Sequence, residues 1–269
     1  MAATATAGHN GETMRALHAL ALLAAVLLTA PASPARAADL TRAEVETLLE
    51  AARAGGRSAD FTGRSLASLD LSGLDFSGAD LSDADLSDTD LRRAKLVGTR
   101  LVGATLARAR LNLAWVMAAD FSRADLREAV LETLVVSEGL EIRPEEVNRF
   151  TGADLSGARV TARFHRADFR GARLANLQAS VDMRNQSMGM IRTEFTGATM
   201  TSADFKNAQL ARVDFKFARL MEADFRAADL TRADFAGADL TRANFTGATV
   251  EGAVFDSATL DGTRGLPGR

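Results

Sequence analysis

The sequence has no cysteine, no tyrosine, one tryptophan and only three histidines in 269 residues. The lack of cysteine excludes a disulfide framework, a thiolate nucleophile and a cysteine-based zinc site. Two histidines, His9 and His18, lie near the start of the chain, so His165 alone cannot supply the paired imidazoles typical of a metal site. The formal net charge of −3 does not favour a broad basic surface for nucleic acid.

The first residues, 1–37, have the pattern of a secretory signal peptide. Arg15 precedes an apolar run over Leu17–Ala30, and the run is followed by Ala35-Arg36-Ala37. The run has 14 residues, which is short for a membrane span. We therefore expect cleavage after Ala37, no membrane span in the cleaved protein, and a periplasmic or secreted location.

A single amphipathic helix is predicted over 41–54, inside a segment, 38–58, that precedes the rest of the fold. Thr41 and Glu44 are spaced as a capping box, in which each side chain accepts a free backbone N–H group. Val45 and Leu49 then lie on one apolar face. We expect this helix to cap the N-terminal end of the fold that begins at residue 59.

From residue 59 onward a large apolar residue recurs at every fifth position, usually with alanine two positions before it. A period of five fits neither an α-helix nor a strand. A short repeat cannot bury its apolar face alone, so such units must stack as a solenoid. The pattern covers 59–131 and, with interruptions, 150–262; in its last part the large residues are Phe195, Met200, Phe205, Leu210, Phe215, Leu220, Phe225, Leu230, Phe235, Leu240, Phe245, Val250, Phe255 and Leu260.

The number of repeats in one coil is indicated by two patterns. Phenylalanine recurs every ten residues in the last part of the chain, which fits coils of 20 residues and not of 15. An offset of 20 also places opposite charges above one another, as in Asp75–Lys95 and Asp88–Arg108, whereas an offset of 15 mostly stacks like charges. We therefore predict a four-sided coil with a column of phenylalanine on each of two opposite sides.

Repeats such as Ala79-Asp80-Leu81-Ser82-Asp83, Ala238-Asp239-Leu240-Thr241-Arg242 and Ala243-Asn244-Phe245-Thr246-Gly247 resemble those of the pentapeptide-repeat family. The resemblance implies an all-β solenoid, a right-handed quadrilateral β-helix with four pentapeptides per coil. About nine coils at the spacing of β-strands give a rod roughly 40 Å long.

The repeat is interrupted at 132–149 and at 175–193, and a tail, 263–269, comes after it. Insertions in a solenoid become loops, and loops carry function more often than the scaffold does. A functional site is therefore expected near these two interruptions.

Three large apolar residues, Leu113, Trp115 and Met117, occupy outward positions of the repeat just before the first interruption. One interpretation is that 132–149 folds over them. The other is a patch that binds a protein partner, to which Phe217, another outward aromatic residue, could contribute.

No motif in the sequence predicts catalysis or a cofactor. The regularly spaced aspartates are interpreted as a solvated face with turn caps. Met183, Met188 and Met190 could offer thioethers to Cu(I), but methionines also fill irregular gaps under loops, so no metal site is assigned.

The leading hypothesis is an exported, non-catalytic scaffold that binds a protein partner in the cell envelope and does not bind nucleic acid. The family resemblance implies an alternative, a topoisomerase-binding protein that imitates duplex DNA, and also a possible homodimer through the C-terminal end. The sequence has one acidic coil, but the arginines and lysine of 92–110 largely cancel its charge. The acidic coil consists of Asp70, Asp75, Asp80, Asp83, Asp85, Asp88 and Asp90. Charge and export therefore both disfavour the DNA imitation.

Overall fold

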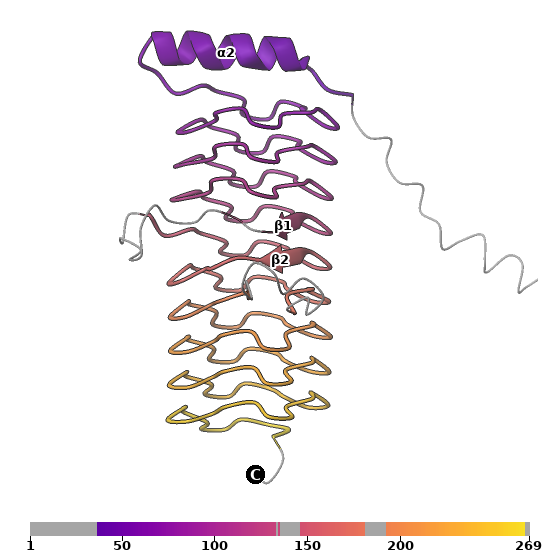
Figure 1. Cartoon of the computed structure of the whole chain (residues 1–269), viewed down its shortest axis with the longest axis vertical. Helices are drawn as coiled ribbons and strands as arrows, with labels where there is room; N and C mark the ends of the chain where they lie inside the picture. The colour runs from indigo at the N-terminus through magenta and orange to yellow at the C-terminus, as the bar shows by residue number, and fades with distance from the viewer. Residues whose placement is uncertain (1–36, 133, 135–145, 181–191, 267–269) are drawn as a thin grey trace, which may run out of the picture. The chain divides into compact units, whose positions relative to one another are not determined.

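The computed structural model describes residues 37–132, 134, 146–180 and 192–266, which belong to one compact unit. The regular elements are helix α2 (Arg42–Ala54) and two short strands, β1 (Val130–Glu132) and β2 (Arg159–Thr161). After α2 the chain winds as a stack of coils, and the two strands are the places where the pairing between coils is longest (Figure 1). None of the helices in the described residues is long and apolar enough to cross a membrane.

Neighbouring coils pair in parallel through single residues that are 20 positions apart, such as Asp60 with Asp80 and Asp75 with Lys95. Each pairing has two backbone hydrogen bonds. The N–H of Asp80, in the second coil, donates to the carbonyl oxygen of Ala59 in the first coil at 2.9 Å, and the carbonyl oxygen of Asp80 accepts the N–H of Phe61 in the first coil at 2.8 Å. This register confirms the predicted four-sided coil. We number the sides by their residue in the first coil: side 1 has Asp60, side 2 Ser65, side 3 Asp70 and side 4 Asp75.

The length of the stack can be traced along side 1. Its members pair in one continuous column of ten levels, so the stack has slightly more than the nine coils expected: Asp60, Asp80, Arg100, Asp120, Arg149, Asp168, Thr199, Arg219, Asp239 and Thr259.

One repeat shows why five residues make one side and one corner. Ala79 and Leu81 are buried, so they fill the interior while Asp80 between them faces outward. Oδ1 of Asp80 accepts the backbone N–H of Ser82 at 2.9 Å, which holds the start of the corner. Asp83 then takes a left-handed φ of 56° and turns the chain onto the next side. The aspartate of the repeat is therefore a corner cap.

Phenylalanines form two columns in the C-terminal half of the stack. Phe205, Phe225 and Phe245 stack with ring centroids 4.9 and 5.0 Å apart, and a second column contains Phe215 and Phe235, 5.0 Å apart. Rings of the two columns also meet edge to face. Their centroids are 5.7–6.0 Å apart in the three pairs Phe225–Phe235, Phe235–Phe245 and Phe245–Phe255. Both contacts are favourable geometries for aromatic rings. The predicted pair of columns is confirmed.

Helix α2 lies against the first coil. The capping box between Thr41 and Glu44 is present, with Thr41 N–H donating to Glu44 Oε2 at 2.7 Å. Val45 and Leu49 are buried in the core, and Arg42 Nη1 donates to the carbonyl oxygen of Asp70 at 2.7 Å. The helix therefore supplies both apolar cover and a donor to the first coil, as expected for a solenoid end.

The interruptions change the register at two levels. Asp120 pairs with Arg149 across the first interruption, and Asp168 pairs with Thr199 across the second. Between them Arg149 pairs with Asp168, an offset of 19, because the chain takes only four residues from Arg159 on side 3 to Arg163 on side 4. The repeat is one residue short here: Val160 and Phe164, the large apolar residues of successive repeats, are four positions apart in place of five.

The phenylalanine columns predict a difference between two substitutions. Phe225→Ala removes a fully buried ring that stacks on both sides, so it should lower the free energy of unfolding by about 3–5 kcal/mol. Phe255→Ala removes a partly buried ring that stacks only on Phe235, so it should cost clearly less. Chemical denaturation of both variants measures this; equal losses would contradict the role assigned to the columns.

The corner caps predict that stability falls in acid. Hydrogen bonds from the side chain and backbone N–H of Thr62 lower the pKa of Asp60, and Ser72 lowers the pKa of Asp70 in the same way. A lowered pKa in the folded state stabilises the protein above the unfolded value of about 3.9, and this contribution is lost as the pH falls through the folded value. The melting temperature should therefore drop as the pH is lowered from about 5 to 2. A melting temperature that stays constant over this range would refute the caps as a pH-dependent contribution.

Candidate partner-binding face

Both interruptions leave the stack at the same place, after side 3. In the fourth coil β1 lies on side 3 and is paired as far as Glu132, and the next described residue with a pairing is Arg149 on side 1. In the sixth coil the second interruption falls between Gln178 on side 3 and Glu194 on side 4. Side 4 is therefore the face next to both interruptions, and its described members are Asp75, Lys95, Trp115, Arg163, Glu194, Asp214, Asp234 and Val254.

Two of the three apolar residues predicted to face outward do so. Trp115 on side 4 is 39% exposed, and Leu113 at the preceding corner is 40% exposed. Ala114 between them is buried, so the two large side chains project from the same stretch of coil. They form an apolar patch at the level just before the first interruption, and whether a partner binds there stays a prediction.

Met117 differs from the expectation, because it is only 3% exposed. The chain returns beside it after the first interruption: Ala118 N–H donates to Glu146 O at 3.0 Å, and Asn148 Nδ2 donates to Val116 O. Glu146 and Asn148 are themselves buried. For Met117 the interpretation that 132–149 folds over the outward residues is confirmed, and its inclusion in an exposed patch is wrong, because the returning chain packs at that corner in place of a regular repeat.

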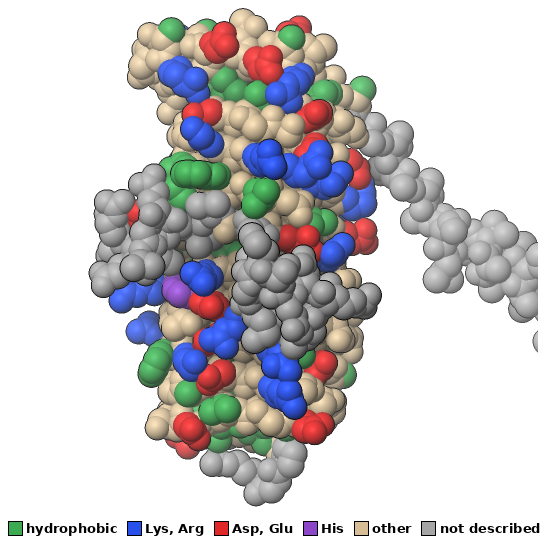
Figure 2. Space-filling view, in the orientation of Figure 1, with side chains coloured by type: hydrophobic (Ala, Val, Ile, Leu, Met, Phe, Trp, Pro, Cys, Tyr) green, Lys and Arg blue, Asp and Glu red, His purple; other side chains and the backbone are tan. Residues whose placement is uncertain are grey.

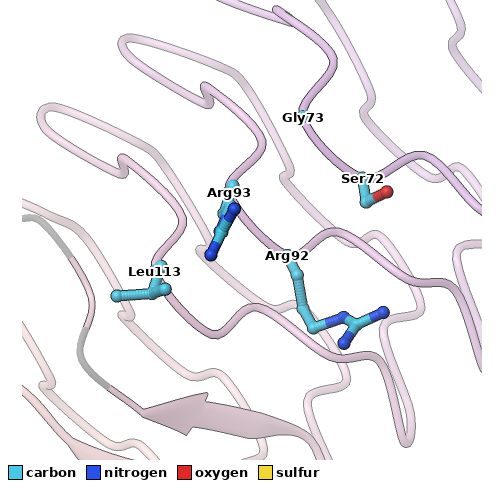
Figure 3. Close-up of a pocket in the computed structure, with 5 residues that line it drawn as sticks. All are labelled: Ser72, Gly73, Arg92, Arg93 and Leu113. Carbon is cyan, nitrogen blue, oxygen red and sulfur yellow. The ribbon is translucent and has the colours of Figure 1, made fainter.

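A depression of about 560 Å³ lies at the corner between sides 3 and 4 in the first three coils. Its lining residues come from successive levels of this corner: Ser72 and Gly73, then Arg92 and Arg93, then Leu113. Figure 3 shows the two arginine side chains and Leu113 projecting outward from these levels. Leu113 thus belongs to both the apolar patch and the depression.

Of the two arginines of the depression, one has an ion-pair partner and the other has none among the described residues. Arg92 Nε donates to both carboxylate oxygens of Asp90, at 2.8 and 2.9 Å, and this hydrogen bonding lowers the pKa of Asp90. The side chain of Arg93 is exposed and has no hydrogen bond or ion pair with any described residue. Arg93 therefore carries a positive charge at this corner that no described residue compensates.

Farther along side 4 a charged network joins the fifth to the eighth coil. His165 Nε2 lies 2.7 Å from Glu194 Oε2, and Arg163 Nε lies 3.7 Å from the same oxygen. Arg192 Nη2 pairs with Asp214 Oδ2 at 2.8 Å, and Asp214 also lies 3.3 Å from Lys216 Nζ. The network fixes the chain where it leaves the second interruption, because Arg192 is the first described residue after it.

Lys216 connects this network to the regular coils. Its ammonium group lies 2.9 Å from Asp234 Oδ2, one coil farther on. The hydrogen bond to Asp234 raises the pKa of Lys216, and the charge of Asp214 acts in the same direction against the opposing effect of burial. Sequence reasoning missed the contacts of His165 with Glu194 and of Arg192 with Asp214, because the first crosses the second interruption and the other starts at its end, so neither has the fixed spacing of the repeat.

Phe217 is the most exposed large apolar side chain among the described residues, at 66%. It lies at the corner between sides 4 and 1 and has a left-handed φ of 56°, which is uncommon for a bulky residue. A Cβ atom added to Gly237, one coil farther on, would lie 2.6 Å from Phe217 Cδ1. The ring therefore rests on the bare backbone of Gly237, apart from the Leu113–Trp115 patch.

The described residues contain no cluster of three or more His, Cys, Asp or Glu side chains that could hold a metal ion. Met183, Met188 and Met190, the residues weighed for Cu(I), lie outside the described residues. The charged groups of the side 4 network are arranged in ion pairs across neighbouring coils.

The coil geometry defines a β-solenoid built from repeats of five residues, and comparison with known proteins agrees. The family model for pentapeptide repeats matches eight copies, over residues 57–93, 84–123, 190–216 and 218–256. The chain belongs to the pentapeptide-repeat family. A search of curated proteins finds no match to the chain.

Several solved structures of pentapeptide-repeat proteins are similar to this chain. HetL, involved in heterocyst differentiation regulation in the cyanobacterium Nostoc, is 25% identical, with 80% of this chain and 94% of HetL covered and a TM-score of 0.31. A trypsin-treated variant of QnrB1, a plasmid-mediated fluoroquinolone resistance protein, is 18% identical, with 74% and 83% covered and a TM-score of 0.29. A protein of the Arabidopsis thaliana thylakoid lumen is 31% identical, with 44% of this chain and 71% of that protein covered and a TM-score of 0.19.

The network on side 4 predicts unequal effects for two aspartates with the same corner cap. Asp214 and Asp234 each accept the N–H of the residue two positions later, at 2.9 and 3.0 Å, but their side chains are 5% and 22% exposed. Asp214→Ala leaves two half-buried cations, Arg192 and Lys216, without their shared partner, so it should destabilise the protein by about 1–2 kcal/mol more than Asp234→Ala does. Thermal and urea unfolding of both variants measures the difference; a larger loss in Asp234→Ala would overturn the assignment.

Proposed function

We propose that the chain is an exported, non-catalytic, right-handed β-solenoid that acts as a scaffold for a protein partner in the cell envelope. The observation that carries this proposal is the exposed pair Leu113 and Trp115 at the level just before the first interruption. The other exposed large apolar side chains among the described residues, Leu48, Phe217 and Val254, are separated along the sequence. The face drawn in Figure 2 carries many acidic and basic side chains. Aromatic side chains are enriched in protein interfaces, where they supply much of the binding energy.

The charged surface supports a scaffold in preference to a DNA-like rod. Acidic residues of one coil pair with basic residues of the next, as in Asp88 with Arg108 at 2.6 Å and Glu132 with Arg159 at 2.7 Å. A duplex surface instead presents regularly spaced negative charge without such compensation. The topoisomerase-binding alternative predicts inhibition in a gyrase supercoiling assay, and no effect at micromolar protein would remove it.

Export rests on the sequence of residues 1–37, which lie outside the described residues apart from Ala37. The test is the intact mass and N-terminus of the protein from fractionated cells. A start at Ala38 in the soluble envelope fraction supports export. A start at Met1 or Met14 in the cytoplasm contradicts it and favours the DNA-like alternative.

The C-terminal end of the stack supports the proposed homodimer. Phe255, Leu260 and Leu266 are only partly buried there, whereas the N-terminal end is covered by α2. A second copy would remove this apolar surface from water. Light scattering should give the mass of a dimer, and a monomeric mass at all concentrations tested would refute this part of the proposal.

The scaffold proposal predicts that partner capture depends on the apolar patch. The double variant Leu113→Ser with Trp115→Ser should recover at least about tenfold less partner than the wild type in cross-linked pull-downs from envelope extracts, because the central apolar contacts are lost. Val254→Ser is the matched control, since Val254 is also on side 4 and is 37% exposed. Equal recovery by all three proteins, or no partner recovered by the wild type, would contradict the proposal.

A further inference from the structure

We propose that the depression at the corner between sides 3 and 4 binds an acidic peptide segment of the partner, with a carboxylate on Arg93 and an apolar side chain on Leu113 and Trp115. This inference rests on the proposed function, because it names the chemistry of the segment that the scaffold would hold. The arrangement of Arg92, Arg93 and Leu113 is visible in Figure 3.

The charge at this corner selects an anionic group. Arg92 is neutralised by Asp90, to which it donates from Nε at 2.8 Å and from Nη2 at 2.5 Å. Arg93, the next residue in the chain, lines the same depression without an ion-pair partner among the described residues. A guanidinium group binds a carboxylate through two parallel hydrogen bonds, so an aspartate or glutamate side chain is the complementary ligand.

The apolar part of the site selects a large apolar neighbour. Leu113 lies at the same corner as Arg93, one coil farther along, and its side chain is 40% exposed. Trp115, two residues on, is 39% exposed and extends the apolar surface onto side 4. Arg93 and Leu113 therefore form a pair of unlike contact points in one column of the stack.

A buried acceptor marks the same corner as incompletely satisfied. Asn112, which precedes Leu113, donates from Nδ2 to Glu132 Oε2 at 3.2 Å, but its buried Oδ1 has no hydrogen-bond donor among the described residues. Such a group costs free energy unless a donor reaches it. Because this oxygen is buried and Asn112 does not line the depression, the proposed site consists of the unpaired cation and the exposed apolar pair alone.

The spacing between the contact points restricts the sequence of the peptide. Successive coils are about 4.8 Å apart, and an extended peptide rises about 3.3 Å per residue. The peptide residue whose carboxylate binds Arg93 and the peptide residue whose apolar side chain contacts Leu113 or Trp115 are therefore one or two positions apart. The expected motif is Asp or Glu with Leu, Ile, Phe or Trp within two positions on either side.

The test is selection of a random peptide library displayed on phage against the full chain. Selected peptides should contain the acidic and apolar motif, and the synthetic peptide should change the fluorescence of Trp115, the only tryptophan in the protein. Arg93→Gln should weaken its binding about tenfold, as expected for the loss of one charge-assisted pair. Leu113→Ser should weaken it as well. Both variants should keep the melting temperature of the wild type, because both side chains are exposed.

Arg212→Gln is the matched control. Arg212 lies at the same corner in the seventh coil, has a left-handed φ of 65° as against 60° for Arg93, and has no ion pair with a described residue. Its substitution should leave binding unchanged. Peptides that lack an acidic residue, equal loss in Arg93→Gln and Arg212→Gln, or no selected peptide would overturn the inference. If Arg93→Gln still captures the protein partner as well as the wild type does, the scaffold function stands and this site assignment fails.

Discussion

The structure depends on one constraint, the parallel backbone hydrogen bonding between residues one coil apart. Apart from β1 and β2, each side pairs through one residue. A single coil therefore makes too few bonds to be stable, and the stack gains its stability from repetition. Because the same side chain position recurs above itself at every level, any favourable contact becomes a column. The phenylalanine rings, the corner aspartates and the alternating surface charges are all consequences of this one register.

The corners carry the energetic cost of this constraint. The corner position often takes a left-handed φ even where it is not glycine, as at Asp83 and Phe217. Such a conformation is unfavourable for an L-residue by roughly 1–2 kcal/mol. The hydrogen bond from the corner backbone to the preceding aspartate, together with the closure of the turn onto the buried apolar residue, offsets this cost. The repeat Ala-Asp-Leu-x-x is thus a complete description of one side and one corner.

Periodicity explains which features could be predicted from the sequence. The twenty-residue coil, the two aromatic columns and the ion pair of Asp88 with Arg108 can all be found by counting positions, because a regular register converts sequence distance directly into spatial distance. The capping box at Thr41 is predictable from local chemistry in the same way. The right-handed winding is different, since spacing is the same for either hand, and it stays an implication of the family.

The count of five is not sufficient where the register changes. Met117 occupies an outward position by the count of five, but the chain that returns at Glu146 and Asn148 buries it. His165 and Glu194, which are in contact, are 29 residues apart in the sequence, whereas paired residues of regular neighbouring coils are 20 apart. Local spacing is informative only between interruptions, so the candidate face could be located from the sequence while its polar network could not.

The short step between Arg159 on side 3 and Arg163 on side 4 has a consequence for how the length of such a chain can change. The side 1 column continues from Arg149 to Asp168 in spite of this step, and the regular offset of 20 returns from Glu194 onward. A residue lost within a side would exchange the inward and outward positions, whereas a residue lost at a corner leaves the next side in phase. Corners are therefore the positions at which insertions and deletions can accumulate while the stack is kept.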